Sequence, residues 1–229
     1  MKQRVLSAVI LSVIVAGITV FQVASPSAEG IAKDSFFEYG KILHEQAERN
    51  TDFRSDNIAL RGSSVSISID DLKEVYAYYR SVCASESNAF DQSIRYNEEY
   101  YSLYAKAISE GYKVTEEEAC KYVSELKNTL YSKNTDPSEL KQYKEIISSF
   151  DSEDEYWDYT VKCYMKALPI QKMNADMEKS YLSKHPDATS DDFSAYYEKF
   201  KDQLVEKQDF KKARGFAKKE VTSVWRSDY

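Results

Sequence analysis

Glycine and proline are scarce in this chain of 229 residues, which contains 6 glycines and 4 prolines. Turns in β-sandwiches and barrels are rich in both residues, so their scarcity argues against those folds and favours long helices. Positive charge is also in deficit, because 31 Lys and Arg face 38 Asp and Glu, for a net charge of −7. An acidic chain repels phosphate, and we therefore expect no nucleic acid among its partners.

Residues that commonly carry chemistry are few. The 2 histidines, His44 and His185, have no Cys or His at metal-ligand spacing, and the 3 cysteines form no C-x-x-C pair. In an exported protein two of Cys83, Cys120 and Cys163 could form a disulfide, or all three could be small core residues. Glycine-rich phosphate loops and the G-x-S-x-G hydrolase motif are missing as well. We therefore predict no catalytic residues, no metal site and no cofactor.

A long apolar segment near the start is the strongest single signal. Residues 5–21, VLSAVILSVIVAGITVF, carry no charge and follow Lys2 and Arg4. Extended to Ala24, the segment has the ~20 residues that a helix needs to cross a bilayer core. Basic residues before such a segment predict a signal anchor over 1–28, with the body outside the cytoplasm and tied to the membrane. A cleaved signal peptide, which would give a secreted protein, is the alternative.

The remainder shows mostly the three- and four-residue spacing of amphipathic helices. Residues 29–56 are expected to form a helical stalk or the first helix of the domain. Within 57–69, Val65, Ile67 and Ile69 alternate with serines, which predicts one short extended segment. The predicted fold class is therefore all-α, with one N-terminal transmembrane or signal helix and a multi-helix domain over 57–229.

Several helix boundaries are marked by capping residues. Ser68 with Asp71, and Thr115 with Glu118, have the spacing of a capping box. Further starts are predicted at Asn88, at Asp136-Pro137, near Asp151 and at Thr189 or Ser190, and Gly111 and His185-Pro186 are predicted ends. Pro169 should kink or interrupt its helix, and the last helix should run to about Trp225. The acidic runs 116–118 and 153–155 belong to first helical turns, where acids complement the helix dipole.

Tyrosine is abundant, with 19 residues. Two aromatic groups cover more than one face of their helices, so their rings either pack against helices on both sides or stay partly exposed. Exposed aromatics beside polar residues suit weak contact with unfolded polypeptide. The predicted contact residues are Tyr96, Tyr100, Tyr101, Tyr104, Tyr156 and Trp157. The basic segment 210–225, FKKARGFAKKEVTSVW, could contact anionic lipid, bind the acidic body, or be a solvated helix face.

Three stretches, in this order, resemble the N-terminal chaperone domain of the SurA/PrsA class of extracytoplasmic foldases. They are IALRGSSVSISIDDLKEVYAYY (58–79), YYSLYAKAISEGYKVTEEEACKYVSELK (100–127) and YKEIISSFDSEDEYWDYTVKCYMKALPIQKM (143–173). Members of that class usually continue into a parvulin prolyl-isomerase domain, whereas the short remainder here is predicted to be helical. In the third stretch Phe150-Asp151 replaces the usual glycine.

The resemblance implies a non-catalytic, chaperone-like protein that holds unfolded or exported polypeptide near the membrane. It supplies no catalytic residues. The alternative is a structural or interaction protein of the envelope that binds one specific folded partner. The oligomeric state does not follow from either reading.

Overall fold

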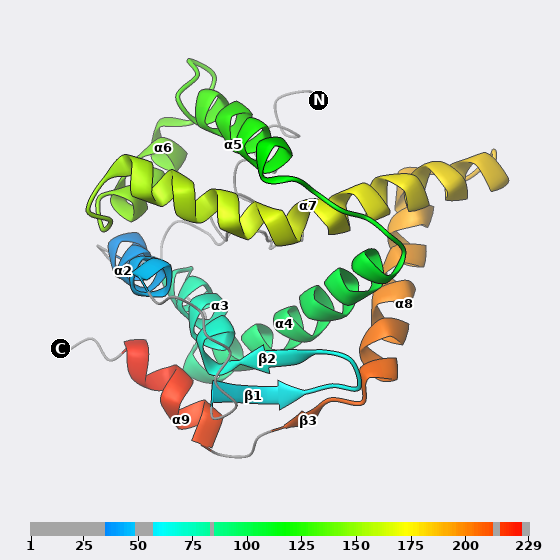
Figure 1. Ribbon diagram of the computed structural model, residues 1–229, viewed down its shortest axis with the longest axis horizontal. Coiled ribbons are helices and arrows are strands. Elements are labelled where there is room, and N and C mark those ends of the chain that lie inside the picture. Colours follow the sequence, from blue (N-terminus) through cyan, green and yellow to red (C-terminus); the bar gives the residue numbers. More distant parts are fainter. Residues whose placement is uncertain (1–34, 49–56, 83–84, 213–215, 226–229) are drawn as a thin grey trace.

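The computed structural model describes residues 35–48, 57–82, 85–212 and 216–225, which are mostly helical (Figure 1). The all-α class is therefore confirmed in its general form. No helix in these four ranges is both long enough and apolar enough to cross a membrane. The predicted anchor over 1–28 lies outside the described residues. Of the predicted stalk or first helix, the described part is a helix that belongs to the packed body.

The helices pack beside a small sheet, which lies at one end of the molecule (Figure 1). The described helices are α2 (Ser35–Glu48), α3 (Ile69–Ser81), α4 (Glu86–Ser109), α5 (Glu116–Leu130), α6 (Pro137–Ile147), α7 (Glu153–Lys184), α8 (Ser190–Gln208) and α9 (Phe216–Thr222), followed by a 3-10 turn, Ser223–Trp225. The strands are β1 (Ile58–Arg61), β2 (Ser66–Ser68) and β3 (Lys211–Lys212).

Capping boxes begin helices where the sequence predicts them. The Ser68 hydroxyl accepts from the Asp71 N–H at 3.0 Å, and the Asp71 carboxylate accepts from the Ser68 N–H at 2.8 Å. Thr115 and Glu118 make the same reciprocal pair at the start of α5. These bonds satisfy N–H groups that have no partner within their own helix. Helix α6 also starts as predicted, with Asp136 as its cap and Pro137 in its first turn.

Two predicted helix boundaries are wrong. Helix α4 begins two residues before Asn88, because Ser85 precedes it and accepts from the Asn88 N–H at 3.3 Å. Helix α7 is not interrupted at Pro169, but its axis bends near the middle of the helix, which agrees with the predicted kink (Figure 1). Its neighbours Leu168 and Ile170 are buried, and this packing outweighs the hydrogen bond that proline cannot donate. Helix α8 ends at Gln208 rather than near Trp225.

Contacts with the sheet explain the early end of α8. Asp209 adopts a left-handed conformation with φ of 46°, after which β3 pairs antiparallel with β1. The Gln208 carbonyl accepts from the Ser63 N–H at 2.7 Å, and its side chain accepts from the Ser64 N–H at 3.0 Å. The single extended segment predicted within 57–69 is instead two antiparallel strands, β1 and β2. Together with β3 they form a three-stranded sheet in the order β2-β1-β3.

Within the described ranges the core consists of three connected clusters. The largest joins α2, α3, α5, α6 and α7, the second joins the sheet with α3, α4 and α9, and the third joins α4 and α7 with α8. In Figure 1, α7 crosses above α3 and α4, and the sheet lies below them. Helix α3 contributes buried residues to the first two clusters, and α4 contributes buried residues to the second and third.

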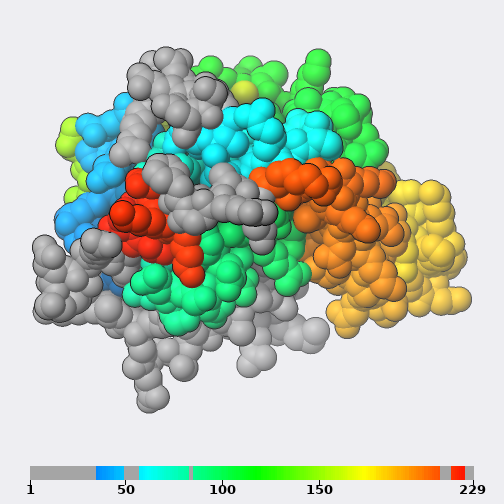
Figure 2. Space-filling model, turned by 90° about the horizontal axis from the view of Figure 1, so that it is seen from below, coloured from blue at the N-terminus to red at the C-terminus, as the bar shows by residue number. Residues whose placement is uncertain are grey.

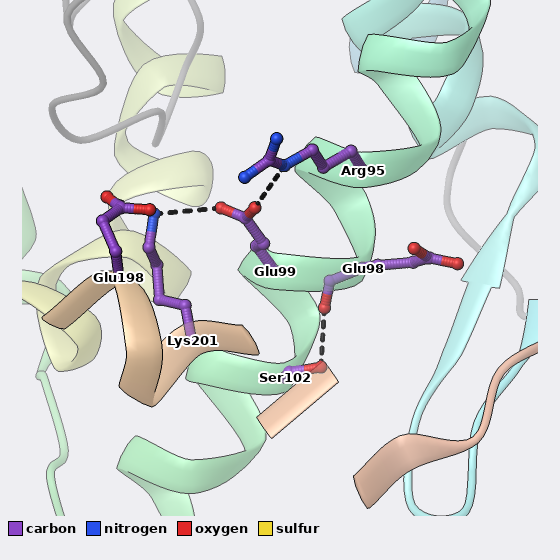
Figure 3. A network of polar contacts seen from close by, with 6 residues as sticks. All are labelled: Arg95, Glu98, Glu99, Ser102, Glu198 and Lys201. Carbon is purple, nitrogen blue, oxygen red and sulfur yellow. Dashed lines mark hydrogen bonds and ion pairs between the residues drawn. The ribbon is translucent and has the colours of Figure 1, made fainter. Parts of the chain in front are cut away.

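A buried ion-pair network fixes α8 to α4 (Figure 3). The Lys201 side chain is 0% exposed, and its Nζ lies 3.1 Å from Glu99 Oε2 and 2.9 Å from Glu198 Oε1. The other oxygen of Glu99 accepts from Arg95 Nε at 2.9 Å. Because both charges of the Glu99–Lys201 pair are removed from water, each depends on the other for compensation.

Candidate functional site

Glu74 lies where α3 faces α7, α4 and α2. On α3 it is three residues after Asp71, which places both carboxylates on one side of the helix. Tyr159 and Cys163 lie on one side of α7 by the same spacing rule, as do Tyr96 and Tyr100 on α4. The groups that act electrostatically on Glu74, or on which Glu74 acts, come from four helices: Tyr39, Asp71, Tyr96, Tyr100, Tyr101, Tyr159, Cys163 and Lys166.

These groups lie around Glu74, and we call their common location the Glu74 recess. Glu74, Tyr96, Tyr100 and Cys163 each keep part of their surface exposed. Burial is nevertheless the main reason that the pKa of each of these groups is raised. A side chain that faced open solvent would not lose its hydration in this way. These four side chains are therefore largely surrounded by protein, although part of each remains exposed.

The carboxyl of Glu74 is the most perturbed acid of the recess. Burial, and then the negative charge of Asp71, raise its pKa from 4.5 to about 7. A hydrogen bond donated by Tyr159 and the positive charge of Lys166 act in the opposite direction. At neutral pH this carboxyl is therefore about half protonated. It can take up or release a proton when a charge enters the recess.

Asp71 is held by bonds from its own helix start and from α4. Its Oδ2 accepts from the Ser68 N–H at 2.8 Å, and its Oδ1 accepts from the Tyr101 hydroxyl. The Asn97 side chain donates to the Asp71 carbonyl at 3.3 Å. Burial and the adjacent Asp71 raise the pKa of Tyr101, so this phenol stays protonated and acts as a donor. Asp71 is therefore a fixed negative charge at the edge of the recess.

Aromatic rings form one wall of the recess. Tyr96 and Tyr100 are stacked with their centroids 5.9 Å apart and their planes 17° apart. Tyr101 stands edge-on to Tyr100 with a centroid separation of 5.5 Å. The Nζ of Lys166 lies 5.7 Å from the centroid of Tyr101. The ammonium of Lys166 thus makes a cation–π contact with Tyr101.

Cys163 is a thiol rather than a nucleophilic thiolate. Burial, followed by the charge of Glu74, raises its pKa well above the usual range. A thiolate is the reactive form of cysteine, so this side chain is inert in the recess. Cys120 is exposed, and neither it nor Cys163 forms a disulfide. Cys83 lies outside the described residues.

The six aromatic residues predicted from the sequence are divided between different surroundings. Tyr96 and Tyr100 line the recess, and Tyr101 is buried beside it. Tyr104 packs partly buried against the cluster of Leu103, Ala107, Ile170 and Met173. Tyr156 and Trp157 are buried in the largest core cluster, where Tyr156 meets Phe150 edge-on at 5.3 Å.

Sequence reasoning missed Glu74, Tyr39, Tyr159 and Cys163 as members of one site. Their common signal is weak, because each belongs to an ordinary amphipathic pattern. The one available clue was an acidic residue, Glu74, directly before a run of buried α3 residues. Only the packing of four helices brings it opposite the tyrosines.

A second group of polar side chains lies at the start of α7. His44 Nε2 is 3.3 Å from Glu155 Oε1, and one ligand atom each of His44, Asp151 and Glu155 lie within 4.8 Å of one another. The imidazole also packs on Phe150, with ring centroids 5.1 Å apart. Acids at a helix start complement its dipole, which accounts for Glu155 without an ion. We therefore take the Glu74 recess as the candidate site.

Neither the family models nor the curated proteins nor the solved structures with which the chain was compared give a match. The likeness to the SurA/PrsA class stays a prediction from the sequence.

Proposed function

We propose that the protein is a non-catalytic, extracytoplasmic, chaperone-like protein that holds unfolded or exported polypeptide near the membrane. The observation that supports this most is a row of tyrosines on α4. Tyr96, Tyr100 and Tyr104 recur every fourth residue, so they share one side of the helix, and each keeps part of its surface exposed. The proposal also draws on the sequence resemblance and on the apolar segment over 1–28.

The tyrosine row has the chemistry for loose binding of an extended chain. A tyrosine ring offers apolar area, and its hydroxyl offers a hydrogen bond to passing backbone groups. The row borders all three core clusters, because Tyr96 packs on the first, Tyr100 on the second and third, and Tyr104 on the third. Its backbone is therefore rigid. A flexible chain loses conformational entropy when it is ordered on the tyrosine row, and this loss offsets much of the favourable contact energy. We therefore expect weak and adaptable binding.

The alternative, an envelope protein that binds one folded partner, is favoured by the tip of the α7–α8 hairpin. In Figure 2 the yellow C-terminal part of α7 projects at one edge of the molecule. There Tyr181 of α7 stacks on Tyr196 of α8 with centroids 4.9 Å apart, and Tyr196 is 44% exposed. Rigid, exposed aromatics of this kind are common anchors in specific interfaces.

An aggregation assay tests the main proposal. The full chain, kept soluble in a mild non-ionic detergent, is added to a client protein that unfolds on reduction, and light scattering is followed. We expect near-stoichiometric suppression, weakened about tenfold, or by ~1.4 kcal/mol, when Tyr96, Tyr100 and Tyr104 are all changed to Ser. Tyr131→Ser is the matched control, because Tyr131 is 42% exposed and lies at the end of α5.

Suppression no better than that of an inert acidic protein of equal charge would rule out the holding role. In that case a Tyr196→Ser variant tests the alternative in pull-downs. Loss of one stoichiometric partner on this change would support the specific interface.

A further inference from the structure

We propose that His44, Asp151 and Glu155 bind one divalent transition-metal ion, for which Zn²⁺ is the probe. The site joins helix α2 to the start of α7, and it is independent of the proposed holding of polypeptide. One ligand atom of each residue lies within 4.8 Å of those of the other two. The sequence predicts no metal site, because the histidine and the two carboxylates belong to distant segments that only tertiary packing brings together.

The imidazole of His44 is the group that points to a ligand. Its Nε2 is buried and has no hydrogen-bond partner among the described residues. Glu155 Oε1 lies 3.3 Å from this nitrogen, which is an ion-pair distance, but the two atoms do not form a hydrogen bond. A buried polar atom without a partner is costly, and an ion is one of the groups that can satisfy it. The helix dipole accounts for Glu155 but not for this nitrogen.

The distances between the three side chains fit a small ion. Zn²⁺ binds histidine nitrogen and carboxylate oxygen at about 2.0–2.2 Å in a tetrahedral arrangement, so two of its ligand atoms are about 3.4 Å apart. The separation of 3.3 Å between His44 Nε2 and Glu155 Oε1 already fits this spacing. Asp151 is exposed, so rotation of its side chain can bring its oxygen from within 4.8 Å to the same spacing.

Close packing of α2 holds His44 in place. Gly40 lies one helical turn before His44, and a Cβ atom at Gly40 would lie 2.7 Å from the Ile146 carbonyl oxygen. Helix α2 therefore lies directly against the end of α6, close to the start of α7 (Figure 1). The imidazole packs on the ring of Phe150, with the ring centroids 5.1 Å apart. These contacts keep Nε2 near the carboxylates.

A backbone hydrogen bond orients Glu155. Its Oε2 accepts from the Asp151 N–H at 3.0 Å, whereas its Oε1 is the oxygen nearest His44. Carboxylates that bind metal ions are typically held by hydrogen bonds of this kind, which fix the direction of the binding oxygen. The same bond keeps the backbone of Asp151 beside Glu155, so both carboxylates approach His44 from one side.

The local charge favours a cation. The start of a helix carries about half a positive charge, which by itself would repel a metal ion. Four acidic residues, Asp151, Glu153, Asp154 and Glu155, nevertheless gather at the start of α7. Of these, Glu153 pairs with Lys127 at 3.0 Å. The remaining three outweigh the helix dipole.

The mixed donor set favours a transition metal over Mg²⁺ or Ca²⁺. Ca²⁺ takes roughly six to eight oxygen ligands, and Mg²⁺ prefers an octahedron of oxygens that includes several waters. An imidazole nitrogen suits Zn²⁺ and its neighbours in the first transition row. Three protein ligands would leave the fourth position of Zn²⁺ to water, an arrangement that zinc sites commonly use.

Calorimetric titration of the full chain with zinc chloride tests the inference, after chelator treatment and in a mild non-ionic detergent. All samples carry Cys120→Ser, because Cys120 is exposed and thiolates bind Zn²⁺. We expect one ion per chain, with an affinity that His44→Ala weakens about tenfold or more. His185→Ala is the matched control, because His185 is the other histidine of the chain and is exposed at the end of α7. It should not alter the binding of Zn²⁺.

A second measurement keeps the inference testable if His44→Ala does not fold. The chain is labelled with 15N-histidine, and the spectrum of His185→Ala assigns the remaining ring resonances to His44, since the chain has 2 histidines. Saturating Zn²⁺ should shift the Nε2 resonance of His44 and leave the ring resonances of His185 in place.

Three results would overturn the inference. The first is an unshifted His44 Nε2 resonance without heat of binding, which would leave a direct attraction between His44 and Glu155. The second is Zn²⁺ binding that His44→Ala leaves intact, which would place the ion elsewhere. The third is displacement of Zn²⁺ by millimolar Mg²⁺, which would show that oxygen ligands alone hold the ion.

Discussion

At the scale of single residues, burial changes what a side chain does with a proton. Glu74 has a pKa of about 7 in the folded chain against 4.5 for an unperturbed glutamate. The folded state therefore binds the proton more tightly than the unfolded state does. The proton held by Glu74 therefore stabilises the folded state most strongly below pH 4.5. This stabilisation is lost as the pH rises towards 7, and it is absent above that pH. The difference corresponds to about 3 kcal/mol.

The first prediction uses this pH window. Glu74→Gln removes the titrating group but keeps the shape and a hydrogen-bond acceptor for Tyr159. Relative to this variant, the unchanged protein should lose about 3 kcal/mol of unfolding free energy between pH 4.5 and pH 8. Urea unfolding at several pH values measures the difference. Parallel stability curves for the two proteins would contradict the raised pKa.

The second prediction concerns Lys201. Lys201→Met leaves Glu99 buried with only Arg95 on one side, and removing one partner of a buried pair costs about 3 kcal/mol or more. The double change Lys201→Met with Glu99→Leu should recover much of that loss, because no buried charge remains. Urea unfolding of both single variants and the double variant gives the coupling energy. Independent, additive effects would show that the pair is not coupled.

At the scale of elements, the capped helix starts follow local chemistry, whereas contacts between helices depend on how closely their backbones approach. Gly40 in α2 shows the second point. A Cβ atom there would lie 2.3 Å from Ser149 Oγ and 2.7 Å from the Ile146 carbonyl oxygen. The backbones of α2 and the end of α6 are thus too close for any side chain at residue 40.

The third prediction is the sign of the Gly40→Ala change. In an exposed helix this substitution stabilises by about 1 kcal/mol. Here the clash with the Ile146 backbone should reverse the sign and cost about 1–3 kcal/mol, as overpacking does. Thermal unfolding measures it, with Ser149→Ala added in a second variant to relieve the side-chain part of the clash. A stabilised Gly40→Ala protein would show that α2 does not pack in this way.

At the scale of the whole molecule, the three clusters share residues. Tyr79 and Val224 pack on both the first and second clusters, and Tyr100 packs on both the second and third. The first described helix, α2, and α9 both contact α3, so residues distant in the sequence meet on one element (Figure 1). Such sharing favours cooperative unfolding of all three clusters.

The fourth prediction tests this cooperativity. Trp225→Phe leaves Trp157 as the sole tryptophan of the 2 in the chain, reporting on the first cluster. Val221→Ala then removes a fully buried side chain from the second cluster and should cost about 2 kcal/mol. The urea midpoints from Trp157 fluorescence and from helical circular dichroism should shift together. A shift in only one of them would reveal separate units.

The sequence by itself determined what depends on near neighbours. Scarce glycine and proline predicted helices, the caps at Ser68, Thr115 and Asp136 marked their starts, and alternating serines predicted the extended segment. Each of these signals acts within a few residues, so one stretch of chain contains all the information needed.

Only the tertiary structure decided the rest. Helix α8 ends where Gln208 meets Ser63 and Ser64, and α7 passes through Pro169 because its neighbours are buried. The Glu74 recess exists because α2, α3, α4 and α7 meet around one carboxyl. Desolvation depends on every atom that surrounds a group, whatever its distance along the chain, and no local pattern records it.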